Sequence, residues 1–154
     1  MDIVRIGVIG VGNMGGNHVG YLANGDIPGA KLTALCDTNA EQLTRMKALS
    51  GENVATFEEA DALMQSNQID AVIVATPHYD HPPLAIKALE RGLHVMIEKP
   101  AGVYTRQVRE MNEAAEKSDR VFGLMFNQRT LGQHQKLKEL VGSGELGELR
   151  RTNY

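Results

Sequence analysis

The feature that most constrains the fold is an alternation of short apolar runs with longer amphipathic stretches. The apolar runs are rich in Val, Ile and Leu and end at turn residues, which is typical of strands buried on both faces of a parallel sheet. The stretches between them predict helices, and this alternation favours right-handed βαβ crossovers. We therefore predict an α/β fold with a doubly wound parallel sheet. The expected strands are 4–9, 32–36, 54–57, 71–75, 94–97 and 121–126, and the expected helices are 17–24, 40–49, 57–65, 82–91 and 106–118.

Composition excludes several classes of protein. The 154 residues are 42% hydrophobic and 23% charged, a mix that predicts a folded globular domain rather than a disordered chain. The net charge is −3 and the basic residues are scattered, so we expect no nucleic-acid partner and no membrane partner. No apolar run reaches the length of a membrane span, and no signal sequence is evident. Cys36 is the only cysteine, which excludes an intrachain disulfide and makes a cytoplasmic location the default expectation.

A glycine motif closes the first predicted strand. Gly10, Gly12 and Gly15 form the pattern GxGxxG between a strand and a helix. In this context the first glycine permits a tight turn, the second lets a pyrophosphate approach the backbone, and the third lets the helix pack closely on the strand. Free N–H groups at the helix N-terminus are suited to hold the phosphates. The alternative is an ordinary tight turn without a ligand.

An acidic residue ends the second predicted strand. Asp37 follows Gly15 at close to the spacing of about 20 residues at which a carboxylate reaches the ribose of a bound dinucleotide. Asp37 would repel a 2′-phosphate and the following Thr38 is uncharged, so we expect NAD as the cofactor, with NADP less favoured. Two alternatives remain. Asp37 caps the next helix, or the glycine loop and the acid bind S-adenosylmethionine in a methyltransferase.

A second cluster follows the strand predicted at 71–75. Thr76, Pro77, His78 and His81 lie in a turn that faces the same crevice as the glycine loop, because ligands of open α/β sheets bind beyond the carboxyl ends of the strands. For His81, contact with a cofactor and a capping or packing role at the next helix are equally favoured. We expect no metal site, since two histidines three positions apart lack further ligands nearby in the sequence.

A third cluster, Glu98, Lys99 and Pro100, follows the strand predicted at 94–97. Proline disfavours helical backbone at the preceding residue, so Lys99 is expected in an extended conformation at the carboxyl edge of the sheet. There its ammonium group can donate a hydrogen bond to a substrate hydroxyl, and partial burial would suit it for proton transfer. The alternative is that Glu98 and Lys99 are neighbouring residues exposed on a loop, without a role in catalysis. A salt bridge between Glu98 and Lys99 is disfavoured, because adjacent strand residues point to opposite faces.

Taken in order, these clusters resemble a known family. The segments GVIGVGNMG (7–15), ATPHYDH (75–81) and VMIEKP (95–100), together with Asp37, are similar to the N-terminal half of the glucose-fructose oxidoreductase, inositol dehydrogenase and MocA (Gfo/Idh/MocA) family, over about residues 3–130. The resemblance implies a Rossmann fold with strand order 3-2-1-4-5-6, a nicotinamide dinucleotide cofactor, and a larger α/β substrate domain that follows.

The resemblance also implies roles for individual residues. The cofactor contacts that it implies are Gly10, Gly12, Asn13, Met14, Gly15, Asp37, Thr38, Thr76, Pro77, His78, His81, Glu98, Lys99 and Asn127. Lys99 is implied to be catalytic as well. The implied reaction transfers a hydride between nicotinamide and a sugar, polyol or related secondary alcohol. The alternative is a non-catalytic dinucleotide-binding sensor or regulatory protein of the same fold.

The C-terminal residues follow a different pattern. A helix is predicted at 131–141, Gly142, Gly144 and Gly147 are expected to end it, and 149–154 is expected to begin a strand. We therefore expect residues 1–127 to form the NAD(P)-binding domain and residues 128–154 to form a connecting helix and the start of a truncated substrate domain; the alternative is a terminal linker. The resemblance implies that the missing domain holds a catalytic Asp and His and most subunit contacts. This fragment is then expected to bind a dinucleotide without useful turnover, and the full-length protein to be a homo-oligomer.

Overall fold

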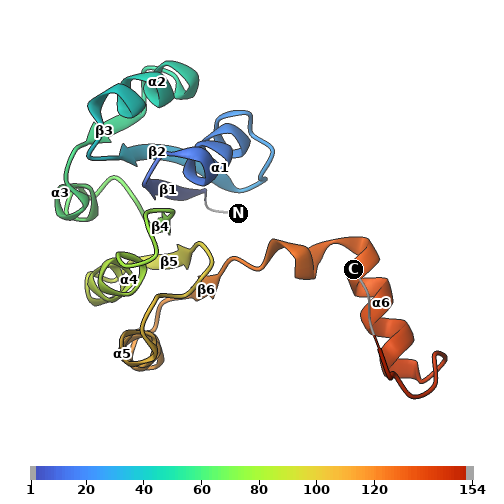
Figure 1. The fold of residues 1–154 in the computed structure, drawn as a ribbon. Coiled ribbons are helices and arrows are strands. Elements are labelled where there is room, and N and C mark those ends of the chain that lie inside the picture. The colour runs from blue at the N-terminus through green and yellow to red at the C-terminus, as the bar shows by residue number, and fades with distance from the viewer. Residues whose placement is uncertain (1–2, 152–154) are drawn as a thin grey trace.

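The computed structural model describes residues 3–151 and shows one six-stranded sheet with helices on both faces (Figure 1). The predicted alternation of strands and helices is confirmed. The strands are β1 (Val4–Ile9), β2 (Ala30–Cys36), β3 (Ala55–Phe57), β4 (Ala71–Val74), β5 (His94–Ile97) and β6 (Phe122–Leu124). The helices are α1 (Asn13–Ala23), α2 (Ala40–Ser50), α3 (Ala60–Met64), α4 (His81–Glu90), α5 (Thr105–Lys117) and α6 (Gly132–Ser143), with a short 3-10 helix η1 (Asn127–Thr130).

The strand order creates a natural ligand site at one edge of the sheet. The strands are all parallel and lie in the order β3-β2-β1-β4-β5-β6, as predicted. The order reverses between β1 and β4, and ligands of such sheets bind beyond the carboxyl ends of the strands at this reversal. A Cβ placed on Gly10 would lie 2.8 Å from backbone atoms of Ala75 and Thr76, so the loops that follow β1 and β4 are in contact.

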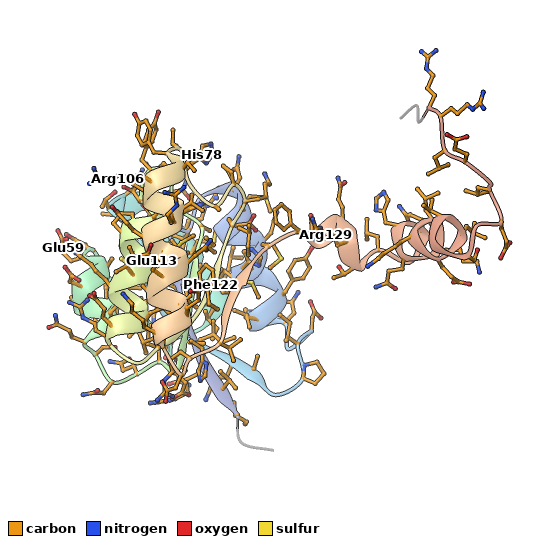
Figure 2. All side chains as sticks on the ribbon, turned by 90° about the horizontal axis from the view of Figure 1, so that it is seen from below. Glu59, His78, Arg106, Glu113, Phe122 and Arg129 are labelled. Carbon is orange, nitrogen blue, oxygen red and sulfur yellow. The ribbon has the colours of Figure 1, made fainter. Side chains whose placement is uncertain are left out.

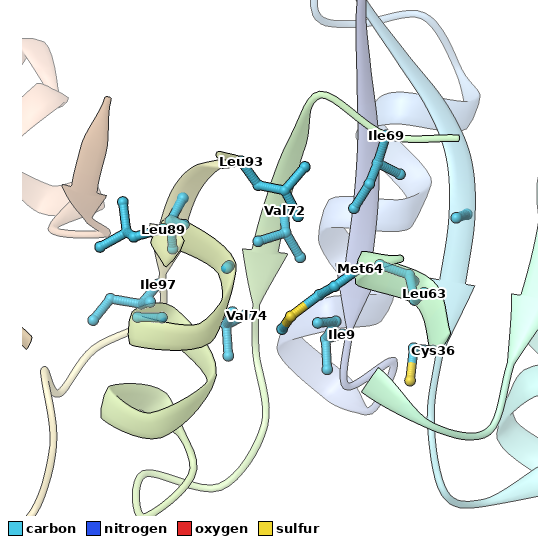
Figure 3. Close-up of a cluster of buried hydrophobic side chains, with 14 of the residues drawn as sticks. Ile9, Cys36, Leu63, Met64, Ile69, Val72, Val74, Leu89, Leu93 and Ile97 are labelled. Atoms are coloured by element: carbon cyan, nitrogen blue, oxygen red, sulfur yellow. The ribbon is translucent and has the colours of Figure 1, made fainter. Parts of the chain in front are cut away.

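The two faces of the sheet bury separate hydrophobic clusters. On one face, α1 and α2 pack on the sheet through Val19, Leu22, Leu43 and Met46. On the other face, α3, α4 and α5 cover a cluster whose labelled members in Figure 3 are Ile9, Cys36, Leu63, Met64, Ile69, Val72, Val74, Leu89, Leu93 and Ile97. Burial of the central strands from both sides explains why their sequences are continuous apolar runs rather than alternating patterns.

Several element boundaries differ from those predicted. Helix α1 begins at Asn13, within the glycine motif, and not at residue 17. The helix predicted at 57–65 is confined to Ala60–Met64, because Phe57 pairs with Cys36 as the last residue of β3. Strand β6 covers only the central residues of the predicted 121–126. These differences shorten or shift elements but leave their order unchanged.

The chain leaves the sheet after β6, and α6 projects away from the body of the molecule (Figures 1 and 2). Helix α6 includes Gly142 and ends at Ser143, so the prediction that Gly142 ends the helix is wrong. The residue that follows, Gly144, has a φ of 78° and caps the helix. Residues 149–151 form no strand, and the rest of the strand predicted at 149–154 lies outside the described residues. Within residues 3–151, no helix combines the length and the apolar character needed to span a bilayer.

Candidate functional site

The glycine loop contains a left-handed turn, a close packing contact and an open position. Gly10 has a φ of 83°, which L-residues other than glycine rarely adopt. A Cβ on Gly15 would lie 1.8 Å from the carbonyl oxygen of Gly10, so α1 and β1 approach each other here as predicted. A Cβ on Gly12 would meet nothing within 4 Å. Gly12 therefore leaves open space at the N-terminus of α1, where the first N–H groups have no partner inside the helix.

Asp37 is tied to this loop. Its Oδ2 accepts a hydrogen bond from the Val11 N–H at 2.8 Å, and its Oδ1 accepts one from the Asn39 N–H at 2.9 Å. The cap of α2 is Asn39, whose side chain accepts hydrogen bonds from Glu41 and Gln42. The alternative that Asp37 caps the next helix is therefore wrong, and its carboxylate lies instead beside the glycine loop.

A crevice of about 600 Å³ opens beside this loop. Its lining comes from the ends of several strands and the segments that follow them: Ile9, Gly10, Gly12, Cys36, Asp37, Thr38, Glu58, Glu59, Ala60, Ala75, Thr76, Pro77, Asp80 and Leu84. Among these residues the charged side chains are all carboxylates. The Thr76 hydroxyl oxygen is buried without a hydrogen-bond partner. An open glycine, a carboxylate and an unpaired hydroxyl fit the diphosphate and ribose hydroxyls of a dinucleotide.

The Cys36 thiol belongs to the wall of this crevice and is 3% exposed. Burial, and then the negative charges of Asp37 and Glu59, raise the pKa of the Cys36 thiol to about 12. The thiol is therefore protonated at neutral pH, and it is not suited to act as a nucleophile.

A second pocket, which we call the Lys99 pocket, has a volume of about 560 Å³. It is lined by Lys99, Pro100 and Ala101 after β5 and by residues 124–129 after β6, which include Asn127. Lys99 is exposed, so the partial burial considered from the sequence is not seen. In the part of the chain that the structure describes, the Lys99 ammonium forms no ion pair. The Arg129 guanidinium lies 4.9 Å from the centre of the Phe126 ring, where the chain departs towards α6 (Figure 2).

His81 connects the crevice to the Lys99 pocket. It is 1% exposed, and its Nδ1 and Nε2 lie 2.8 Å and 2.9 Å from the carbonyl oxygens of Pro100 and Thr76. Both ring nitrogens are thus engaged by backbone, which agrees with the packing role considered for His81. His78 is exposed, with its ring centre 6.1 Å from that of His81. Between residues 3 and 151, no three or more possible ligands are grouped so as to hold a metal ion.

The structure divides the predicted site residues into three groups. The crevice is lined by Gly10, Gly12, Asp37, Thr38, Thr76 and Pro77, and the Lys99 pocket by Lys99 and Asn127. Outside both linings lie Asn13, Met14 and Gly15 at the start of α1, His78 on its exposed loop, and the buried His81 and Glu98.

Sequence reasoning missed one residue of this region, His18. His18 lies on α1, and its Nε2 is 2.7 Å from Oε1 of Glu98, which is 5% exposed. The available signal was its spacing: His18 follows Gly15 by three residues, about one helical turn. Its partner lies too far along the sequence for any local pattern to reveal the contact.

Comparison with known proteins identifies the family. The model of the "Oxidoreductase family, NAD-binding Rossmann fold", the Gfo/Idh/MocA family, matches residues 4–126. The chain belongs to this family. Membership confirms the resemblance found in the sequence, and it shows that the methyltransferase alternative is wrong for this Gfo/Idh/MocA protein.

Individual Gfo/Idh/MocA relatives match almost all of this chain. Inositol 2-dehydrogenase of Rubrobacter xylanophilus is 33% identical over 145 residues, which cover 94% of this chain and 41% of the relative. D-glucoside 3-dehydrogenase of Escherichia coli is 32% identical, with coverages of 97% and 42%. The crystal structure of scyllo-inositol dehydrogenase from Lactobacillus casei, with bound NAD(H) and scyllo-inositol, has a TM-score of 0.89 at 30% identity, with coverages of 96% and 43%. The chain thus spans less than half the length of these relatives.

Proposed function

We propose that this chain is the dinucleotide-binding part of an NAD-dependent dehydrogenase that oxidises a secondary alcohol of a sugar or polyol. The observation that carries the proposal is that the crevice and the Lys99 pocket open at the same edge of the sheet and are joined through His81. A dinucleotide with one end in each would bring nicotinamide beside Lys99. The names of the three relatives above, dehydrogenases of inositols or of a glucoside, support the substrate class.

The proposed cofactor contacts follow the two linings and the start of α1. At the pyrophosphate they are Gly10, Gly12, Asn13, Met14 and Gly15, and at the adenosine ribose they are Asp37 and Thr38. At the central part of the cofactor they are Thr76, Pro77 and His78, and at the nicotinamide they are Lys99 and Asn127. His81 and Glu98 act indirectly, through the loops that they join. When bound, NAD supplies the carbon that accepts the hydride.

Lys99 is the proposed catalytic residue. Its ammonium group would donate a hydrogen bond to the substrate oxygen and stabilise the negative charge that develops there. The hydride would pass to nicotinamide, and the hydroxyl proton would pass to the histidine that the family resemblance implies in the substrate domain. The absence of an ion pair to Lys99 among the described residues keeps this donor available. Because Lys99 is exposed here, the part of the protein that binds the substrate would exclude water from it.

The charge of the crevice favours NAD over NADP. The side chains of Asp37, Glu58, Glu59 and Asp80 line it, and the lining contains no Lys or Arg. A 2′-phosphate on the adenosine ribose would meet these carboxylates at close range, and juxtaposed like charges are unfavourable. The 2′-hydroxyl of NAD, in contrast, can donate a hydrogen bond to Asp37.

Calorimetric titration of the chain with NADH and NADPH tests this preference. We expect tighter binding of NADH. Asp37→Asn removes a charge while keeping an acceptor, so it should shift the affinity ratio towards NADPH by about tenfold, whereas the exposed Asp119→Asn should leave the ratio unchanged. Tighter binding of NADPH by the unmodified chain would contradict the cofactor assignment, and failure to bind either would contradict the proposed function.

The catalytic role of Lys99 is tested in the whole enzyme, with its substrate-binding part present. Lys99→Ala should lower kcat by about 10²–10³-fold, the range for loss of one donor that stabilises a developing negative charge on oxygen. Affinity for ADP-ribose, which lacks nicotinamide, should be unchanged. The matched control is Lys31→Ala, an exposed lysine on β2 near the opposite edge of the sheet, which should keep full activity. Full activity of Lys99→Ala would remove the assignment.

A further inference from the structure

A buried polar pair links the glycine-loop helix to the segment that carries Lys99. His18 projects from α1 with its side chain 13% exposed, and Glu98 directly follows β5 with its side chain 6% exposed. The His18 Nε2 and Glu98 Oε1 atoms are 2.7 Å apart, and the Lys99 N–H donates to Glu98 Oε2 at 3.2 Å. Both oxygens of one buried carboxylate are therefore engaged, one by α1 and the other by the Lys99 backbone.

The burial of Glu98 favours one assignment of donor and acceptor in this contact. A buried carboxylate is stable only when hydrogen bonds or charges compensate for the lost hydration. An ionised Glu98 can only accept, so the His18 Nε2 carries the hydrogen and donates. The same contact turns the Glu98 carboxylate towards α1, and Glu98 forms no ion pair with the Lys99 ammonium.

We propose that His18 is a positioning residue that acts through Glu98 to fix Lys99 relative to the glycine loop. The inference rests on the proposed function, which places Lys99 at the nicotinamide. Gly12 and the N-terminus of α1 lie at the pyrophosphate side, and Lys99 lies at the nicotinamide side. The two sides belong to segments far apart in the sequence, and the His18–Glu98 contact ties them together. A dinucleotide must reach both at once, so their separation determines how well the nicotinamide end is held.

The test compares NADH with ADP-ribose, which shares everything except nicotinamide. His18→Leu should weaken NADH binding by about tenfold, because it removes the donor to a buried charged group. Its affinity for ADP-ribose should be nearly unchanged. His18→Gln places an amide nitrogen near the Nε2 position, so it should retain most of the NADH affinity. The matched control is His94→Leu, since His94 begins β5 at the opposite edge of the sheet.

A second measurement needs no cofactor. Hydrogen exchange of the Lys99 amide, followed by NMR, should be faster in His18→Leu than in the unmodified chain and unchanged in His94→Leu. Unchanged Lys99 exchange in His18→Leu, or equal losses of NADH and ADP-ribose affinity, would overturn the proposal. If the unmodified chain binds neither ligand, the proposed function fails, while the exchange rate still decides the role of His18.

A third measurement covers the case in which His18→Leu does not fold. In the unmodified chain, ¹⁵N NMR of the His18 ring should show a hydrogen on Nε2. An Nε2 without hydrogen would overturn the assignment of His18 as the donor to Glu98, without any substitution.

Discussion

At the scale of single residues, substitutions at two glycines of the same motif should affect stability and cofactor binding separately. A Cβ on Gly15 would lie 1.8 Å from a backbone oxygen, and backbone cannot move aside as a flexible side chain can. We therefore expect Gly15→Ala to lower the free energy of unfolding by about 3 kcal/mol, at the upper end for an overpacked site. Urea denaturation followed by circular dichroism would measure this loss.

Gly12→Ala is the matched comparison. No atom lies within 4 Å of its added Cβ, so the free energy of unfolding should change little. The new methyl group would occupy the space in which we place the pyrophosphate, so NADH affinity should fall even though the fold is intact. Equal destabilisation by the two substitutions would contradict the expected difference in stability. Unimpaired NADH binding by Gly12→Ala would contradict the placement of the pyrophosphate at Gly12.

The site residues that the sequence predicts share one property: the evidence for them is local. Gly10 follows a strand, Gly15 lies in the first turn of the next helix, and Lys99 lies between a strand and a proline. Each predicted role therefore follows from neighbours in the chain. His18 was missed because its partner, Glu98, lies 80 residues away. No periodicity or motif connects two such positions until the sheet has placed β5 near α1.

At the scale of elements, α1 shows where propensity and packing disagree. The helix contains Gly15, Gly16 and Gly20, and each glycine costs about 1 kcal/mol in a helix relative to alanine. The amphipathic pattern in the sequence begins at residue 17, so it predicts a start four residues too late. The structure begins α1 at Asn13 because the close approach at Gly15 and the burial of Val19 favour the helix. Tertiary packing outweighs propensity here, and a single sequence does not display it.

Strand pairing decides a second boundary. The amphipathic pattern at 57–65 continues without a break, and it predicts one helix. In the structure, Phe57 instead pairs with Cys36 at the edge of the sheet, and α3 retains only Ala60–Met64. Glu58 and Glu59 fall between the two elements, and this places them on the wall of the crevice. The acidic character of the crevice therefore depends on a boundary that the pattern alone did not reveal.

At the scale of the whole molecule, the sheet and its helices form one body, and the segment after η1 lies apart from it (Figures 1 and 2). No residue of α6 is buried, and its contact with the preceding turn includes His134 Nδ1 and the Gln128 carbonyl at 2.8 Å. Two of its apolar side chains, Leu137 and Val141, are each 41% exposed. Such a segment adds little burial to the body, so it should add little to its stability.

Truncation tests this separation and, with it, the predicted division of the chain near residue 127. A chain that ends at Thr130 keeps Asn127 and Arg129 in the Lys99 pocket and loses the exposed apolar side chains of α6. Its free energy of unfolding should change by less than about 0.5 kcal/mol, as for other changes to exposed surface. NADH affinity should be unchanged, and self-association in sedimentation experiments should decrease, because less apolar surface is exposed. A large loss of stability or of NADH affinity would instead show that α6 supports the fold or the site through contacts that its exposure does not reveal.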